Sequence, residues 1–239
     1  MRHDRGNGAY GAVKFLIIGG CVGVLVVLAL VAIPVQAKRH SARTKCAQNL
    51  KDIDMAALIW VNDHATYMFP WHVPSRDGGV SEIAMSGDVS AIFRCLSNQF
   101  KDSMVRRSAD VLTCPADTEQ KSESGLTKVA SGNISYFISL DRKRKWEPPN
   151  NAIICGDYIA ILFGDRNISG GILTSNHIME LRATNVVNWG NGMHVRCGNV
   201  AMTDGAVFHL NDKNLREQVS LQLQVIETAP DRKVHFAMP

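Results

Sequence analysis

The chain has 239 residues, of which 46% are hydrophobic and 20% charged, a composition that is ordinary for a globular protein. The net charge of +4 is unevenly spread, because residues 1–45 sum to +6 and the remaining residues to −2. The excess Lys and Arg flank one hydrophobic segment, where they suit anionic lipid headgroups. This distribution excludes a basic nucleic-acid-binding face, and we expect no nucleic-acid partner.

The hydrophobic segment, residues 15–33, is a run of 19 residues without a charged side chain. About 20 such residues cross a bilayer as a helix, so a permanent anchor is the first interpretation. A cleaved signal is the alternative, because Val35-Gln36-Ala37 offers the small residues that signal peptidase prefers, with release of an exported binding module after Ala37. A buried core helix is disfavoured, and basic residues on both flanks leave the orientation open.

Residues 36–64 contain neither Gly nor Pro, and they carry an apolar residue every three or four positions. This spacing predicts that the helix continues beyond the membrane, with one apolar face that packs on a sheet. Pro34 is expected to kink the helix rather than end it. The stripe consists of Cys46, Leu50, Ile53, Ala57 and Val61.

The remainder of the chain predicts an α+β head. Residues 70–130 form a long connection with a short helix near 89–100, and strands are expected at 134–140, 152–155, 159–163, 185–189, 199–202 and 206–210. The last two strands flank Thr203-Asp204-Gly205, which is typical of a tight hairpin turn. A final helix with a cap near Asn211 or Asp212 carries Leu215, Val219 and Leu223, and a basic and apolar tail follows.

Six cysteines occur, and none belongs to a C-x-x-C pair, which argues against a zinc ribbon or a thioredoxin-like site. Cys21 lies in the apolar run and Cys46 just beyond it, so the disulfide candidates in an exported head are Cys95, Cys114, Cys155 and Cys197. Burial of these thiols as small hydrophobic side chains is an equally good interpretation.

Several short motifs occur along the chain. His194 is followed, after nine residues, by Asp204-Gly205. The others, in chain order, are ARTKCAQNLK at 42–51, YMFP at 67–70, LTCPAD at 112–117, SYF at 135–137, and Gly164-Asp165-Arg166-Asn167. In their sequence and order these motifs resemble those of the bacterial prepilin-type proteins that carry an H-X9-DG motif, a group abundant in planctomycetes and verrucomicrobia.

The resemblance implies a type IV pilin-like fold in a bacterial inner membrane. Residues 1–14 would form a short cytoplasmic N-terminus, 15–33 the transmembrane part of the helix, 34–65 its extramembrane continuation and 66–239 an extracytoplasmic head. The implied function is a non-enzymatic pseudopilin-like subunit of a type II secretion or type IV pilus-like system, with the lipid bilayer and other pilin-like or secretion-system subunits as partners. Gly11-Ala12 is the position that corresponds to the family's processing site. The family's glutamate five residues past that site, which serves subunit assembly, is missing from this sequence.

Catalytic motifs such as G-x-S-x-G, H-E-x-x-H and a Walker loop are absent from the sequence. The segment from Gly164 to Asn167 is interpreted as a turn held by Asp165 with Arg166 or the backbone. His177, His194 and His209 lack metal-ligand spacing. We expect no cofactor; calcium held by Asp157, Asp165 and Asp204 is an alternative to the favoured structural roles, in which Asp204 serves the turn and His194 bonds a neighbouring strand or loop.

Overall fold

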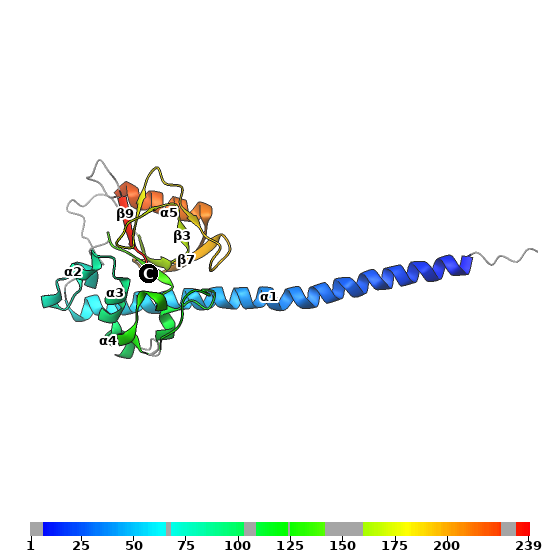
Figure 1. Ribbon diagram of the computed structural model, residues 1–239, viewed down its shortest axis with the longest axis horizontal. Coiled ribbons are helices and arrows are strands. Elements are labelled where there is room, and N and C mark those ends of the chain that lie inside the picture. Colours follow the sequence, from blue (N-terminus) through cyan, green and yellow to red (C-terminus); the bar gives the residue numbers. More distant parts are fainter. Residues whose placement is uncertain (1–6, 66–67, 103–108, 124, 142–159, 226–232) are drawn as a thin grey trace, which may run out of the picture. The chain divides into compact units, whose positions relative to one another are not determined.

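The computed structural model describes residues 7–65, 68–102, 109–123, 125–141, 160–225 and 233–239. The chain divides into two compact units, residues 1–41 and residues 42–239, and helix α1 (Asn7–Asp63) contributes to both (Figure 1). Mixed helix and antiparallel sheet make the fold α+β, as the sequence predicts.

The part of α1 in the second unit buries the predicted apolar stripe. Cys46, Leu50, Ile53, Ala57 and Val61 are each at most 1% exposed, so all five positions lie on one face against the core. The helix continues through Pro34 and ends at Asp63, one residue before the predicted limit.

Among the residues that the structure describes, no helix combines the length and apolar character needed to cross a membrane. Residues 15–33 lie within α1. Their role as a membrane span stays a prediction of the sequence.

Short helices fill the connection between α1 and the sheet. The predicted helix near 89–100 is confirmed as two helices, α3 and α4, and the Asp88 side chain caps the first by accepting a hydrogen bond from the Ala91 amide at 3.2 Å. The α-helices here are α2 (Ser81–Ala84), α3 (Val89–Cys95) and α4 (Ser97–Asp102), and the 3-10 helices are η1 (Pro70–His72), η2 (Ser75–Asp77), η3 (Ala109–Leu112), η4 (Leu126–Lys128) and η5 (Ser131–Asn133).

Within the described residues, seven antiparallel strands form one sheet in the order β4-β5-β9-β1-β2-β7-β8, and β3 pairs with β6 separately. Their bounds are β1 (Tyr136–Ser139), β2 (Ile161–Asp165), β3 (Ile168–Ser169), β4 (Ile172–Leu173), β5 (Ile178–Arg182), β6 (Asn188–Trp189), β7 (Cys197–Met202), β8 (Val207–Asn211) and β9 (Lys233–Ala237).

The sheet is covered on both faces. Tyr136 and Ile138 of β1 pack in the cluster that contains the apolar face of α1, whereas Phe137 between them packs in the cluster of helix α5 (Asp212–Val225). In Figure 1, strands β7 and β9 lie between α5 and the α1 segment of the same unit. Because both faces are covered, all four residues of β1 are buried, and an alternating polar pattern is absent from this strand.

The C-terminal part of the fold confirms some predictions and corrects others. The Asp204-Gly205 turn joins β7 to β8, and the Asn211 side chain caps α5 by accepting from the Asn214 amide at 3.0 Å. The predicted strand at 152–155 lies outside the described residues. The expected tail is instead strand β9, which pairs with β1 and β5 inside the sheet because its apolar residues alternate with Lys233 and His235.

His235 makes the stability of the sheet depend on pH. Its Nδ1 atom lies 2.8 Å from Asp141 Oδ1, and this hydrogen bond raises the pKa of His235 against the opposing effect of burial. The resulting stabilisation is full below the ordinary histidine pKa and is lost as pH rises through the raised value. We expect Asp141→Asn to reduce the fall in unfolding free energy between pH 5.5 and 8.5, measured by denaturant titration.

The matched control for this experiment is Asp77→Asn, because Asp77 is an exposed carboxylate whose partner Arg76 is also exposed. The control should keep the pH dependence of the parent chain. An unchanged pH dependence in Asp141→Asn would contradict the assignment to His235.

Candidate functional site

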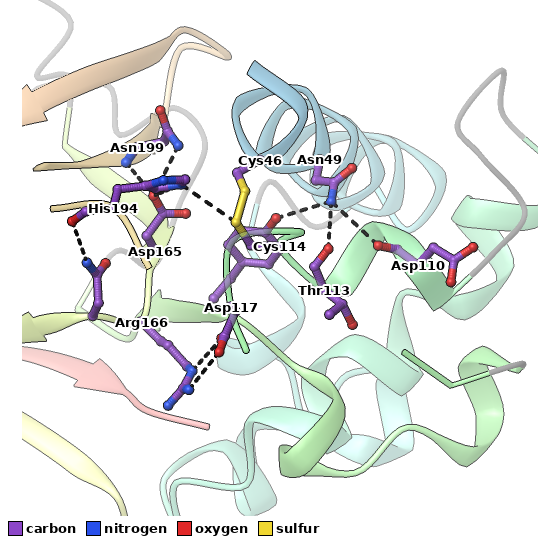
Figure 2. Close-up of a disulfide and its surroundings, with 12 residues drawn as sticks. Cys46, Asn49, Asp110, Thr113, Cys114, Asp117, Asp165, Arg166, His194 and Asn199 are labelled. Carbon is purple, nitrogen blue, oxygen red and sulfur yellow. Dashed lines mark hydrogen bonds and ion pairs between the residues drawn. A yellow bond between two sulfur atoms is a disulfide. The ribbon is translucent and has the colours of Figure 1, made fainter. Parts of the chain in front are cut away.

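Residues from four of the motifs lie together around a disulfide between α1 and Cys114 (Figure 2). The covalent link is a disulfide between Cys46 of α1 and Cys114, whose Cα atoms lie 5.1 Å apart and whose side chains are fully buried. The prediction that set Cys46 aside is therefore wrong. Because the bond joins positions 68 residues apart, the chain-entropy model gives a stabilisation of about 4 kcal/mol.

Asn49 lies three residues after Cys46, on the same face of α1. Its side-chain amide donates to the Thr113 carbonyl at 3.1 Å and to the Tyr136 hydroxyl at 3.2 Å, and the Asp110 carbonyl lies at 3.5 Å. One buried amide thus connects the helix both to the segment around Cys114 and to strand β1.

Gly164 and Asp165 end strand β2 rather than forming the expected turn. A Cβ atom on Gly164 would approach the Phe137 ring to 2.5 Å, so the close packing of β1 on β2 requires glycine. Asp165 does not pair with Arg166; its Oδ2 accepts from the Asn199 amide at 2.6 Å and from the Asn199 side chain at 3.0 Å. The carboxylate therefore connects β2 to β7 inside the core.

Arg166 forms a two-pronged ion pair with Asp117 of the LTCPAD motif. Its Nε donates to Oδ2 at 2.7 Å and one terminal nitrogen to Oδ1 at 2.9 Å, and the same nitrogen contacts Glu119. Burial raises the pKa of Asp117, but the hydrogen bonds and positive charge of Arg166 oppose this effect, and the net pKa is lowered. The pair attaches the Cys114 segment to the end of β2.

His194 is 5% exposed and lies between the disulfide and Asp165. Its Nε2 is 3.6 Å from Cys114 Sγ and 3.7 Å from Asp165 Oδ2. Burial lowers the pKa of His194 to about 4, and the charge of Arg43 acts in the same direction. Burial likewise raises the pKa of Asp165 to about 7, so both groups favour their neutral forms.

Asn167 and the turn residues complete the placement of the motifs. The Asn167 side chain donates to the Gly190 carbonyl at 3.1 Å and reaches the His194 carbonyl at 3.4 Å, which holds the 190–194 loop. Asp204 accepts from the Ala206 amide at 2.9 Å, and Gly205 takes a φ of +87°, which a tight turn favours in glycine. The two ends of H-X9-DG therefore contact different neighbours.

Asp165 and Asp204, two of the acidic residues considered as calcium ligands, do not lie together in the structure. Asp165 bonds Asn199, whereas Asp204 follows Asn199 by five residues along the strand and turn, more than about 10 Å away at the usual rise per residue. Asp157 lies outside the described residues, and Gly11 and Ala12 lie within α1.

One group of residues in the described part of the chain has the composition of a metal site. Cys46, Cys114 and His194 each offer a ligand atom, and these atoms all lie within 4.8 Å of one another. Sequence reasoning left Cys46 out and found no ligand spacing for His194. The signal it could have used is the Cys46-x-x-Asn49 pair, which places a sulfur and an amide on one helix face.

Replacement of Asn49 tests the connection between helix and sheet. We expect Asn49→Ala to lower the unfolding free energy of the purified chain by about 3 kcal/mol, since buried acceptors on Thr113 and Tyr136 lose their donor. The neighbouring control Gln48→Ala removes only an exposed contact with Asp52 and should change stability by less than about 0.5 kcal/mol. Equal effects of the two variants in denaturant titration would refute the role of Asn49.

Replacement of Arg166 tests its paired contact with Asp117. We expect Arg166→Lys to cost about 2 kcal/mol of unfolding free energy, because lysine keeps the charge but cannot donate along both prongs to a nearly buried carboxylate. The control is Arg196→Lys at an ion pair with Asp212, where the arginine side chain is 76% exposed and the expected loss is below about 0.5 kcal/mol. A lysine variant as stable as the parent would contradict the paired geometry.

Comparison of the chain with models of protein families, with curated proteins and with solved structures finds no match. The site is therefore defined by its own contacts. The disulfide and the buried amide of Asn49 join α1 to the Cys114 segment and to β1, the buried carboxylate of Asp165 joins β2 to β7, and the ion pair of Arg166 joins the Cys114 segment to the end of β2.

Proposed function

We propose that this protein is a membrane-anchored, non-enzymatic structural or interaction subunit of the pseudopilin-like class, in a type II secretion or type IV pilus-like system. In this proposal the N-terminus is cytoplasmic, residues 15–33 cross a bacterial inner membrane and the α+β unit lies outside it.

The proposal rests on a change along α1 in the exposure of its apolar side chains, from buried in one part to exposed in the other. Between residues 46 and 61 the apolar stripe is buried in the α+β unit, whereas large apolar side chains between residues 22 and 33 are 51–66% exposed. A row of large apolar side chains that are this exposed among the described residues is suited to lipid or to neighbouring helices. These exposed side chains are Val22, Val24, Leu25, Val26, Val27, Leu28, Leu30 and Ile33.

The disulfide supports an extracytoplasmic position for the α+β unit. Structural disulfides persist in the bacterial periplasm and are rare in the cytosol, where thiols are kept reduced. The Cys46–Cys114 bond begins in α1, 13 residues after the end of the apolar run at Ile33. An oxidising compartment is therefore favoured close to the membrane surface on the side of the head.

The contacts of the motif residues favour a structural role over catalysis. Gly164 packs on Phe137, Asp165 bonds Asn199, and Arg166 is paired with Asp117. His194 and Asp165 are buried where a substrate in solution does not reach them. The motif residues therefore support the fold. In this proposal, binding to other subunits takes place at the surfaces of the head and along the apolar part of α1.

The absence of the assembly glutamate shapes the proposal further. The sequence has no acidic residue between Arg5 and Asn49, so a pilus-like subunit would lack the carboxylate that the resemblance implies for polymerisation. A subunit that stays in the bilayer and acts through helix packing and its head fits this sequence better than a main fibre subunit. Helix association in lipid depends on close packing and does not require that carboxylate.

The test is expression of the full chain in a Gram-negative bacterium, with fractionation, N-terminal sequencing and protease treatment of spheroplasts. We expect membrane-bound protein that resists carbonate extraction, a head that external protease digests, and a Cys46–Cys114 linked peptide in mass spectrometry without reduction. Cys95→Ser should keep that linked peptide, because Cys95 is a free thiol in the structure, and Cys46→Ser should lose it.

The N-terminal sequence distinguishes the alternatives. Membrane protein that starts at Met1 or Ala12 supports the anchor, unprocessed or processed after Gly11. A soluble form that starts at Lys38 would overturn it in favour of a module released by signal peptidase. Soluble protein with both cysteines reduced would overturn the extracytoplasmic assignment as well.

A further inference from the structure

The disulfide, His194 and Asp165 lie close together, although a disulfide does not need a histidine or a carboxylate beside it to link two segments. His194 Nε2 faces both Cys114 Sγ, at 3.6 Å, and Asp165 Oδ2, at 3.7 Å (Figure 2). Ligands on one tetrahedral zinc ion lie at similar separations: bond lengths of about 2.3 Å to sulfur and 2.0–2.2 Å to nitrogen and oxygen put sulfur and nitrogen about 3.6 Å apart, and nitrogen and oxygen about 3.4 Å apart.

We propose that the reduced form of this protein binds one zinc ion through Cys46, Cys114 and His194, with Asp165 as the fourth ligand. The ligand atoms of the two cysteines and the histidine already lie within 4.8 Å of one another. Two adjustments are needed. The two sulfurs, bonded in the oxidised state, separate to about 3.8 Å on a shared ion, and the carboxylate of Asp165, which is outside this group of three, moves toward the ion.

Asp165 supplies an independent observation in favour of a ligand. Its side chain is fully buried, and its Oδ1 atom has no hydrogen-bond partner in the described part of the chain, while Oδ2 serves Asn199. A buried carboxylate oxygen without a partner is costly and calls for an explanation. The oxygen beside His194 is Oδ2, at 3.7 Å, so a rotation of the carboxylate would be needed for Oδ1 to bind a cation there while Oδ2 stays bonded to Asn199.

The charge balance also suits a divalent cation. Two thiolates and one carboxylate carry three negative charges, so a bound zinc ion leaves a net charge of −1. The positive charge of Arg43 acts on His194 and offsets this remainder. Sulfur and imidazole ligands select zinc over calcium, which takes six to eight oxygen ligands. The site therefore shares only Asp165 with the calcium site considered from the sequence, and it takes a different ion.

The two states are related by a balanced exchange. A dithiol reductant transfers two electrons and two protons to Cys46 and Cys114, breaks their S–S bond and becomes a disulfide itself. Zinc then displaces the two thiol protons and the proton of the Asp165 carboxyl group to solvent and forms two Zn–S bonds, with neutral His194 and the resulting Asp165 carboxylate completing the shell. The same residues thus hold α1 to the sheet either covalently or through a metal.

The experiment uses the full chain in detergent, with serine in place of Cys21, Cys95, Cys155 and Cys197 so that only the paired thiols remain. The protein is reduced with dithiothreitol without oxygen, desalted and titrated with Co²⁺ and then Zn²⁺. We expect one Co²⁺ per reduced chain, with thiolate charge-transfer absorption and the intense visible bands of a tetrahedral site, and displacement by Zn²⁺. The oxidised chain should give neither.

Variants assign the ligands. His194→Ala should weaken Zn²⁺ affinity more than about 100-fold, since loss of a partner outside the ligand shell alone costs 10–100-fold. His209→Ala is the control, because His209 is an exposed histidine that contacts Asn199 instead; it should bind as the parent does. Asp165→Asn should bind more weakly than the parent.

Three results would overturn the zinc site. A reduced chain that keeps its circular dichroism but takes up no Co²⁺, or a His194→Ala variant with parental affinity, would overturn the proposal. Should reduction unfold the chain, Zn²⁺ must restore the folded spectrum at one equivalent. Failure of that restoration would equally refute a zinc site.

Discussion

The bond between Cys46 and Cys114 fixes one turn of α1 against the segment that leads into the sheet. From that point the neighbouring contacts follow, because Asn49 is one helical turn further along and meets Thr113 and Tyr136. The Ser135 amide then donates to the Leu112 carbonyl at 2.8 Å, so the segment with Cys114 runs directly alongside the start of β1. A shift of the helix by one turn would separate both Cys46 and Asn49 from their partners.

The polar groups around the disulfide contribute to the fold mainly by specifying one arrangement. An apolar interface of similar volume tolerates sliding, since dispersion contacts have little direction. Buried amides and carboxylates are satisfied only in one register, and they become costly when a partner is lost. Each of three such groups has a partner on a different element: Asn49 bonds β1, Asp165 bonds β7, and Asp117 bonds Arg166 at the end of β2.

Local patterns in the sequence were sufficient for the elements that depend on neighbours in the chain. The buried face of α1, the Asp204-Gly205 hairpin and helix α5 follow from spacings of two to four residues. The central strand β9 was missed because its five residues resemble a tail until β1 and β5 are placed on either side. The partners of Cys46 and Arg166 were missed for the same reason, since they lie 68 and 49 residues away.

The position of β9 has a consequence for the order in which the head folds. Strand β9 separates β5 from β1, and Ile138 pairs with Ala237 almost one hundred residues later. The middle of the sheet therefore stays open during synthesis until residues 233–237 have emerged, and the closing contacts have a high loop-closure cost. In the proposed extracytoplasmic protein, this late closure would leave the sheet open while the chain is being exported.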